Sequence, residues 1–417
     1  MPPIRRLCVQ WPRFGPYHLA RLEAAHRVLS PRGVEVIGLE TATAEKLNSW
    51  EVEQGAVGFR REQVFPGRVF EEVTPAEMEA GVMAALDRLD PDAVAIMSYG
   101  FPDARACLAW CRQNRRVAII TTDTKADDAP RVGWREQIKR VIVNEYDAAF
   151  VSGTPQRRYL EQLGFPSALI SEGCNVVDNA FFDARAREAR ATPEPYRHLP
   201  GLECDAPFFL AVSRLLPLKN LDGLLRAYAR YRASTVAPWR LLLVGDGSDR
   251  ERLERIVSDE RIEGVTFCGY HQAATIGAYY GRASALVLPS FKDTWGLVVN
   301  EAMAAGLPVL VSRKAGCWMD LVEEGRNGFT FDPDDLDAIT VCLRDVAADS
   351  TDREAMGARS REIISAYTPE RYAEGLLEAA NAGLARSNRR ANPLALAALG
   401  MIRRLSRDVT AFHSAEL

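Results

Sequence analysis

Short apolar runs alternate with amphipathic stretches along almost the whole chain. The runs 93–97, 208–212 and 285–288 have the length and composition of strands buried in the interior of a parallel sheet. The stretches between the runs repeat apolar residues at helical spacing, which predicts helices that cover the faces of the sheet. The pattern therefore predicts an α/β protein with doubly wound parallel sheets.

The predicted strands form two sets, which indicates two domains. Strands are expected at 7–9, 34–37, 93–97, 117–120 and 148–151 in the first set, and at 208–212, 240–244, 265–267, 285–288 and 308–311 in the second. The intervening residues are rich in proline and charge, which favours a hinge. We expect an N-terminal domain at 1–180, a hinge at 181–206, a second domain at 207–368 and C-terminal helices at 369–417.

The stretch 290–312 carries the clearest candidate chemistry. It predicts a loop, then a helix from about Trp295 to Ala305, then a buried strand. Asp293 precedes this helix and Glu301 lies about two turns inside it. Between the two carboxylates are the unpaired N–H groups of the first helical turn, which suit a phosphate oxyanion. The layout favours sugar or ribose hydroxyls next to a phosphate, and an ordinary helix with two incidental acids is the alternative.

Two cations on one loop form a second candidate. Arg214 and Lys219 are five positions apart after the strand 208–212, and Pro217 stiffens the loop between them. A planar guanidinium and a mobile ammonium on one loop would clamp a diphosphate. Two surface cations near a turn are the alternative interpretation.

These residues together carry a resemblance to a known family. Asp293, Glu301 and the following Ala-Met-Ala-Ala-Gly-Leu-Pro-Val run (302–309) resemble the signature of family-four retaining glycosyltransferases of the GT-B fold. The family usually has Glu where this chain has Asp293, which keeps the charge but is one methylene shorter. The family also has an Arg, four residues and a Lys, as at Arg214 and Lys219. The likeness extends more loosely over 208–368.

The resemblance implies a fold and an activity. The fold would be two Rossmann-like domains that face each other across a cleft, with a C-terminal helix crossing back to the first domain. The activity would be metal-independent, retaining transfer of a sugar from a nucleotide-diphospho sugar, UDP- or GDP-linked, to a glycan, a glycolipid or a small-molecule hydroxyl. In the family the leaving phosphate takes the acceptor proton, so no strong protein base is expected. No metal or other cofactor is expected, because cations of the chain replace a metal. Polysaccharide or glycolipid biosynthesis is the expected setting.

The resemblance also assigns roles to individual residues. The implied catalytic residues are Arg214, Lys219, Asp293 and Asp123. The implied donor-binding residues are Gly15, Gly245, Asp246, Gly269, Tyr270, Thr294, Trp295, Gly296, Leu297 and Glu301. Glu301 would hold the ribose hydroxyls, as an acid does in dehydrogenases. The segments around Gly245 and Gly269 would face the base.

The chain departs from the family on its N-terminal side. Asp123 stands where the family usually has a His, and it can accept a bond from a sugar hydroxyl but cannot donate one. Phe14-Gly15-Pro16 takes the place of the glycine loop, and the common Gly-Gly pair is absent. His18 follows one turn into the next helix, where a capping or surface role is favoured over an acceptor ligand.

Other functions remain as alternatives. A GT-B pseudoenzyme that binds a nucleotide sugar or a partner transferase without turnover is motivated by the two Asp departures. A nicotinamide dehydrogenase is disfavoured because Gly245-Asp246-Gly247 lacks the third glycine of the dinucleotide fingerprint. A phosphorylase is disfavoured because no lysine has a context typical of a pyridoxal site. The run 332–337 is rich in Asp and favours a helix N-cap over a metal site.

Composition limits partners and location. A net charge of −4 argues against nucleic acid. The eight cysteines are scattered without a Cys-x-x-Cys pair, and there are only five histidines, which favours a reduced cytosolic chain over a zinc or disulfide scaffold. No signal-peptide pattern and no run of about 20 apolar residues is present. We expect a cytoplasmic protein, with contact at the inner membrane face as an open alternative.

Two basic stretches bear on the acceptor. The first contains Lys125, Arg131, Arg135, Lys139 and Arg140. It suits an anionic acceptor or a bilayer surface, or equally a solvated face balanced by Asp127, Asp128 and Glu136. The second is an amphipathic basic tail from residue 391, for which packing on the first domain is favoured over lying on a membrane.

Overall fold

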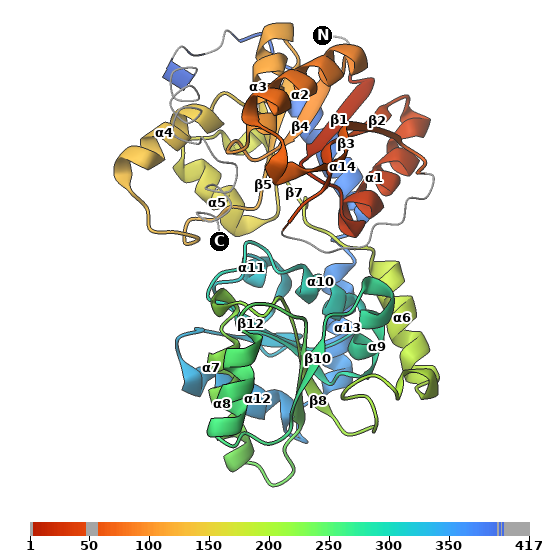
Figure 1. Ribbon diagram of the computed structural model, residues 1–417, viewed down its shortest axis with the longest axis vertical. Coiled ribbons are helices and arrows are strands. Elements are labelled where there is room, and N and C mark those ends of the chain that lie inside the picture. The colour runs from red at the N-terminus through yellow and green to blue at the C-terminus, as the bar shows by residue number, and fades with distance from the viewer. Residues whose placement is uncertain (1–2, 47–56, 390–391, 393, 396–417) are drawn as a thin grey trace. The chain divides into compact units, whose positions relative to one another are not determined.

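The protein folds into two compact units, each built on its own sheet (Figure 1). The computed structural model describes residues 3–46, 57–389, 392 and 394–395. Unit 1 contains the described residues up to Val176 together with those from Pro369 onward, and unit 2 runs from Val177 to Thr368. The α/β class and the two parallel sheets predicted from the sequence are confirmed.

Unit 1 is a seven-stranded sheet in the order β3-β2-β1-β4-β5-β6-β7, parallel throughout. Its strands are β1 (Arg6–Trp11), β2 (Glu35–Ala44), β3 (Arg60–Val69), β4 (Ala93–Met97), β5 (Val117–Thr122), β6 (Ala148–Val151) and β7 (Ile170–Glu172). Its helices are α1 (Pro16–Leu29), α2 (Pro75–Leu89), α3 (Pro102–Asn114), α4 (Gly133–Val143), α5 (Thr154–Gln162) and α14 (Pro369–Gly383).

Alternation along β6 shows which helices cover which face of this sheet. Ala149 and Val151 belong to the apolar core that α2 and α3 close from one side. Phe150 points the other way, and its ring lies 5.2 Å from that of Tyr372 in α14. Helix α14 also packs on α1. The C-terminal helix therefore completes the core of unit 1 although it follows unit 2 in sequence.

Unit 2 is a six-stranded parallel sheet in the order β10-β9-β8-β11-β12-β13. Its strands are β8 (Phe208–Val212), β9 (Arg240–Val244), β10 (Val265–Gly269), β11 (Ala285–Leu288), β12 (Val309–Ser312) and β13 (Gly328–Phe331). Its helices are α6 (Asn179–Ala191), α7 (Leu221–Ala233), α8 (Arg250–Asp259), α9 (Ala273–Arg282), α10 (Leu297–Ala304), α11 (Trp318–Leu321), α12 (Leu336–Ala347) and α13 (Arg353–Ile364).

The segment predicted as a hinge at 181–206 begins as a helix instead. Asp178 caps α6 by accepting the N–H of Phe181 at 3.0 Å. Phe182, Ala186 and Ala189 recur at helical spacing and are buried on the side that meets α9 and α10. The charged residues on the opposite side of α6 made the segment resemble a linker. The chain passes between the units at Val176–Val177 and again at Thr368–Pro369.

Two further strands, β7 and β13, were missed because neither is a continuous buried apolar run: Ser171, Glu172, Phe329 and Thr330 in them are only half-buried. Strand β3 lies between β2 and α2 in the chain, and residues 47–56 before it lie outside the described residues. The basic tail from residue 391 also lies outside them except for residues 392, 394 and 395. None of the described helices combines the length and apolar character required to cross a bilayer.

We predict that Leu376→Ala lowers the free energy of unfolding by about 3 kcal/mol, the usual cost of a cavity under a fully buried leucine. Leu376 is 0 % exposed on the buried side of α14. Glu378→Ala on the same helix is the control, since its side chain is 52 % exposed and its removal should cost less than about 0.5 kcal/mol. Chemical denaturation measures both. Equal effects would contradict the role of α14 in the core of unit 1.

Candidate functional site

The candidate site of unit 2 lies where the order of its strands reverses. β8 is the first strand of this sheet and β11 the fourth, yet they are neighbours at its centre, so the chain leaves them toward opposite sides. Ligands of open α/β sheets bind at the carboxyl ends of strands at such a switch point. The loops after these two strands, 213–220 and 289–296, contain Arg214, Lys219 and Asp293, the charged residues that the sequence assigned to the diphosphate and the sugar in this unit. Glu301, assigned to the ribose, lies in α10 directly after the second loop. Asp123 belongs to unit 1.

Hydrogen bonds tie these two loops together. The N–H of Phe291 donates to the carbonyl of Leu218 at 2.9 Å. Asn220 is 2 % exposed, and its amide donates to the carbonyls of Pro289 at 3.2 Å and Pro333 at 2.8 Å. Asn220 has a φ of +52°, a left-handed conformation that Asn tolerates better than most residues. The sequence analysis did not identify Asn220, although an Asn directly before a helix is a usable signal.

Lys219 and Asp293 form an ion pair across the two loops. Lys219 Nζ donates to Asp293 Oδ2 at 2.7 Å, and the two side chains are 14 % and 16 % exposed. The sequence placed the cation on a diphosphate and the acid on a sugar, and the structure brings the two side chains into direct contact. Charges this sheltered from water interact more strongly than an exposed pair. The ion pair holds both charged groups near the N-terminus of α10.

Helix α10 begins at Leu297, after Gly296, whose backbone conformation glycine adopts more easily than other residues. Gly296 has a φ of +103°, and a Cβ there would lie 2.8 Å from Leu288 Cδ2. Gly296 is the N-cap residue of α10, and glycine has no side chain that could accept a hydrogen bond. Gly296 therefore offers no side-chain acceptor to the first N–H groups of the helix. Trp295 is buried, and its indole N–H donates to Asn300 Oδ1 at 3.0 Å. The first turn of α10 thus has the polarity that suits an anion.

Glu301 lies deeper than the sequence suggested. It is 1 % exposed, and the hydroxyl of the fully buried Tyr280 donates to its Oε2 at 2.6 Å. The structure therefore holds this carboxylate in a fixed orientation inside the unit. Neither Asp293 nor Glu301 points into bulk solvent, as both would if they were incidental surface acids.

The glycines after β9 allow two loops to touch. A Cβ on Gly245 would lie 1.9 Å from the carbonyl oxygen of Ser213, and one on Gly247 would lie 2.3 Å from that of Leu215. The N–H of Leu215 donates to the carbonyl of Asp246 at 2.9 Å. The Gly-Asp-Gly run is thus required by packing against the Arg214 loop, whatever its ligand.

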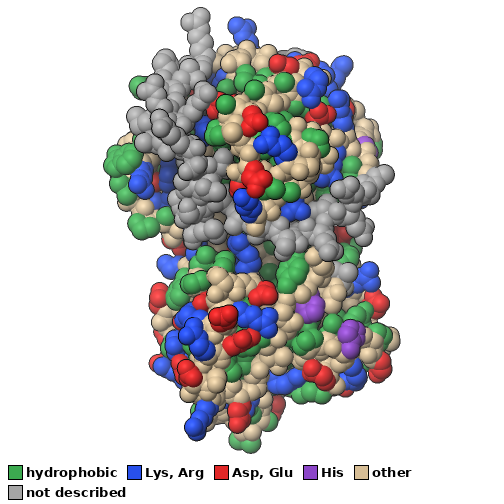
Figure 2. All heavy atoms as spheres, viewed as in Figure 1, with side chains coloured by type: hydrophobic (Ala, Val, Ile, Leu, Met, Phe, Trp, Pro, Cys, Tyr) green, Lys and Arg blue, Asp and Glu red, His purple; other side chains and the backbone are tan. Residues whose placement is uncertain are grey.

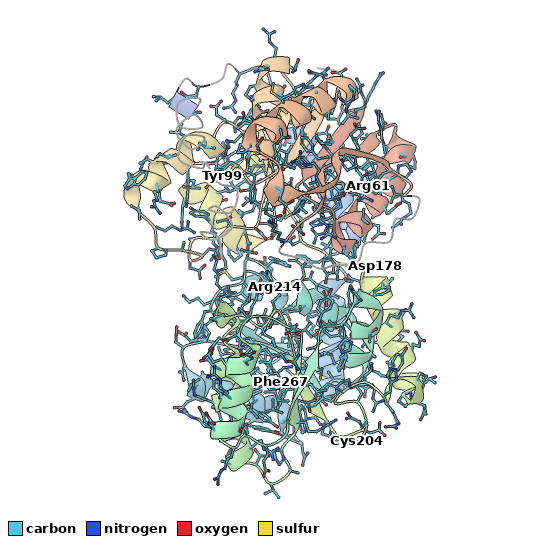
Figure 3. The ribbon with its side chains drawn as sticks, in the orientation of Figure 1. Arg61, Tyr99, Asp178, Cys204, Arg214 and Phe267 are labelled. Carbon is cyan, nitrogen blue, oxygen red and sulfur yellow. The ribbon has the colours of Figure 1, made fainter. Side chains whose placement is uncertain are left out.

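The remaining predicted residues of unit 2 lie along the same edge of the sheet. Arg214, labelled in Figure 3, and Asp246 are exposed, and Thr294 and Leu297 are half-buried. Gly269 ends β10 with a φ of +78°, and Tyr270 next to it is 44 % exposed. Two exposed apolar residues were not predicted: Phe291 in the loop after β11, 40 % exposed, and Met319 in α11, 41 % exposed. The signal for Phe291 in the sequence was a large apolar residue within a polar loop.

Unit 1 has its own switch point between β1 and β4, and the loop after β1 contains Gly15. Buried Glu40 accepts the N–H of Phe14 at 2.8 Å, and the Arg61 guanidinium donates to its other oxygen at 2.6 Å. The N–H of Gly15 donates to Nδ1 of His18 at 2.9 Å, so His18 caps α1 and its own ring proton lies on Nε2. Burial, and secondarily Arg21, holds the pKa of His18 well below its ordinary value. The capping role expected for His18 is confirmed.

Asp123 follows β5, one strand away from that switch point. Gln156 donates to its backbone carbonyl at 3.2 Å. Because Asp123 and Gly15 belong to unit 1 and the other predicted residues to unit 2, the structure groups the predicted residues into two separate sets.

Most of the basic stretch after Asp123 is neutralised. Lys125 Nζ lies 2.9 Å from Asp127 and 2.8 Å from Asp128. Glu136 lies 2.9 Å from Lys139 and 3.7 Å from Arg131. The acids Asp127, Asp128 and Glu136 therefore balance three of the five cations, as the second interpretation expected, but Lys125 is buried and not solvated.

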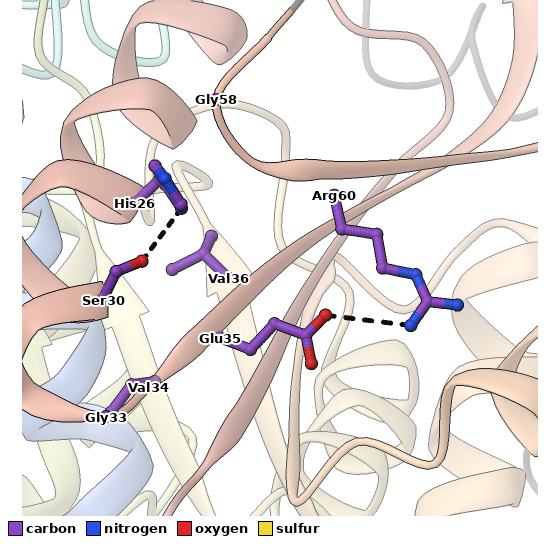
Figure 4. A pocket seen from close by; sticks show the side chains of 8 residues that line it. All are labelled: His26, Ser30, Gly33, Val34, Glu35, Val36, Gly58 and Arg60. Carbon is purple, nitrogen blue, oxygen red and sulfur yellow. Dashed lines mark hydrogen bonds and ion pairs between the residues drawn. The ribbon is translucent and has the colours of Figure 1, made fainter.

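A hollow of about 420 Å³ in unit 1 lies away from these residues (Figure 4). Its wall includes the start of β2 and β3, where Glu35 and Arg60 approach to 3.7 Å, and a hydrogen bond between His26 and Ser30. This is the amino edge of the sheet, opposite to the edge at which its switch point lies. Among the described residues no cluster of His, Cys, Asp or Glu has the arrangement of a metal site. Asp335 caps α12 through the N–H of Ala338, as the sequence favoured for this acidic run.

A match with a known protein family falls within unit 2, the unit that contains the loops 213–220 and 289–296. Residues 197–363 match the family model described as glycosyl transferases group 1. The matched residues include both loops of the unit 2 switch point, and with them Lys219, Asp293 and the start of α10.

Relatives and solved structures extend the comparison beyond this domain. A GDP-mannose-dependent alpha-(1-6)-phosphatidylinositol monomannoside mannosyltransferase of Mycolicibacterium smegmatis is 32 % identical over 248 residues, which are 55 % of this chain and 62 % of the relative. The chain thus spans less than two thirds of that protein's length. Sucrose-phosphate synthase from Thermosynechococcus elongatus superposes with a TM-score of 0.67 at 20 % identity, over 89 % of this chain and 96 % of that one. Anabaena HepE in complex with UDP-glucose gives 0.65 at 18 % identity, over 89 % and 98 %. The chain has the GT-B fold.

We predict that Asn220→Ala lowers the free energy of unfolding by about 3 kcal/mol, because it leaves two buried carbonyls without their donor and strains the left-handed backbone. Asn220→Gly loses the same hydrogen bonds but adopts the positive φ without strain, so it should cost measurably less. Thermal and chemical denaturation measure the difference. Identical losses in the two variants would show that the conformation of residue 220 contributes nothing.

Proposed function

We propose that the chain is a retaining glycosyltransferase that moves a sugar from a nucleotide-diphospho sugar, UDP- or GDP-linked, to a hydroxyl acceptor. The observation that carries the proposal is the pairing of Lys219 with Asp293 at the N-terminus of α10, on the two loops of the switch point. The group 1 family match and the names of the relatives support the reaction class.

The difficulty of the reaction is the charge that develops on the leaving diphosphate. Arg214 and Lys219 are on the loop after β8, and the N–H groups of α10 begin one loop away. A preorganised donor aimed at such a charge contributes on the order of 10² to 10³ in rate. We infer that the diphosphate takes the ammonium of Lys219 and the first-turn amides, with Arg214 closing over it from the exposed side.

The acids have different roles in this proposal. Asp293 loses part of its contact with Lys219 when the diphosphate binds, and it then accepts a hydrogen bond from the donor sugar. Glu301 accepts the ribose hydroxyls, and Tyr280 keeps its carboxylate in a fixed orientation through the 2.6 Å bond. Gly245, Asp246, Gly269 and Tyr270 face the base. We assign Gly15 to the donor phosphate and Asp123 to the sugar as contributions of unit 1.

The acceptor in this proposal is a glycan or a lipid-linked hydroxyl. The mycobacterial relative is named for a phosphatidylinositol monomannoside acceptor, which supports a lipid-linked substrate and a location at the cytoplasmic membrane face. Without an acceptor, a working donor site slowly transfers sugar to water. Hydrolysis of UDP- or GDP-sugars therefore separates an enzyme from a binding protein that has lost turnover.

We predict that Arg214→Ala and Lys219→Ala each lower the transfer rate by about 10² to 10³ while the melting temperature stays near that of the parent. Arg255→Ala is the matched control, because Arg255 is an exposed arginine of the same unit on the outer side of α8. Steady-state kinetics with UDP- and GDP-sugars measure the effect. Parent-like rates in either site variant would overturn the proposed diphosphate site.

We predict that one of UDP, GDP, ADP and dTDP stabilises the protein by about 2.7 kcal/mol at 100 times its Kd, measured by thermal shift. Because cations of the chain take the place of a metal in this proposal, the shift should persist in EDTA. Loss of the shift in EDTA and its return with Mg²⁺ would contradict the metal-independent site. The Lys219→Ala variant serves as the control with an impaired diphosphate site.

A further inference from the structure

Two aromatic rings meet at the carboxyl end of β1, at the switch point of unit 1. Trp11 is the last residue of β1, and His18 lies in the first turn of α1. Their ring centres are 4.4 Å apart and their ring planes are inclined at 43°. Both side chains are half-buried. The Trp11–His18 pair therefore borders the edge of the sheet at which ligands of such folds bind.

Each ring of the pair has one N–H group that the fold does not use. His18 Nδ1 accepts the N–H of Gly15, so the proton of the neutral imidazole is on Nε2. In the described part of the chain, neither this Nε2–H nor the indole N–H of Trp11 has a protein acceptor. Neither nitrogen is fully buried, so a ligand can reach both. A tryptophan N–H usually finds a partner when its ring is sheltered from water. Two such donors side by side therefore indicate a ligand with two neighbouring oxygen acceptors.

The charged side chains next to the pair neutralise each other. Glu40 is the partner of Trp11 in the register of β1 and β2, and it lies 2.6 Å from Arg61, which Figure 3 labels. Arg13, in the loop after β1, lies 3.6 Å from Glu45. Figure 2 shows acidic and basic side chains interspersed over the visible face of unit 1. An anionic ligand would therefore have to compete with a carboxylate for either arginine, whereas an uncharged ligand needs no cation.

We propose that the Trp11–His18 pair binds an uncharged sugar or cyclitol ring of the acceptor. The C–H groups of this ring lie against the exposed part of the indole, whose face is negatively polarised and attracts them. Two neighbouring hydroxyl oxygens of the ring accept the N–H groups of Trp11 and His18. The inference rests on the proposed transfer reaction, to which it adds the chemical class of the acceptor and two residues that bind it. Neither residue contacts the donor in that proposal.

The test measures binding of small sugars to the full chain by isothermal titration calorimetry. The uncharged probes are methyl α-mannoside, methyl α-glucoside and myo-inositol, and the charged probes are glucuronate and mannose 6-phosphate. We expect at least one uncharged probe to bind, and to bind more tightly than both charged probes. Trp11→Ala removes the indole face and its N–H, so it should raise the Kd of that probe about tenfold or more. Trp11→Phe keeps an aromatic face and loses only the N–H, so it should raise the Kd about threefold.

The chain offers a matched control in another tryptophan of unit 1. Trp134 in α4 is 58 % exposed, and Trp134→Ala should bind the probes like the parent. Parent-like binding by both Trp11 variants would overturn the proposal, and so would tighter binding of a charged probe or no binding of any uncharged probe. Melting curves show whether each variant is folded, and if Trp11→Ala is not, the comparison of Trp11→Phe with the parent decides.

A second readout separates this inference from the proposed reaction. Hydrolysis of a UDP- or GDP-sugar without acceptor should stay near the parent rate in the Trp11 variants, because the acceptor takes no part in it. A large loss of hydrolysis in folded Trp11→Phe would assign Trp11 to the donor and overturn the acceptor site. If the parent neither hydrolyses nor transfers a nucleotide sugar, yet binds an uncharged probe through Trp11, the proposed reaction fails and the sugar site stands.

Discussion

The contact between the loops after β8 and β11 is the constraint on which the candidate site depends. The two strands are neighbours only because the strand order reverses between them, so residues 74 positions apart in sequence meet in one ion pair. Asn220, in the first loop, donates to the carbonyl of Pro289 in the second loop and to the carbonyl of Pro333, which precedes α12. Hydrogen bonds between the two loops thus fix the backbone positions from which Lys219 and Asp293 extend.

Close backbone approach is the second requirement of this region. Gly245 and Gly247 let the loop after β9 lie directly on the loop that carries Arg214, and Gly296 is the N-cap residue from which α10 begins. Each of these glycines occupies a place where a Cβ would collide with its neighbours. The glycines therefore make the dense arrangement of loops possible, and the charged residues supply its chemistry.

Unit 1 repeats the architecture but uses different means to hold its first loop. There the buried carboxylate of Glu40 accepts a backbone N–H of the loop, and Arg61 balances the charge. His18 closes the start of α1 in the place of a side-chain oxygen. Both units therefore fix the loop after their first strand with buried polar contacts, and satisfied buried polar contacts make a structure rigid.

The sequence by itself determined the parallel α/β class, most of the strands, and the motif residues of the group 1 domain. These follow from local periodicity and from residue spacing, which do not depend on how distant segments meet. It missed the short strands β7 and β13, and it mistook α6 for a hinge because the buried face of that helix shows only against α9 and α10. Only the tertiary structure decided that Lys219 pairs with Asp293, that Tyr280 holds Glu301, and that Lys125 and Lys139 are neutralised while Arg135 is not. The physical reason is that the strand order and burial decide which groups a charged side chain meets. Neither can be predicted from the residues that adjoin it in the sequence.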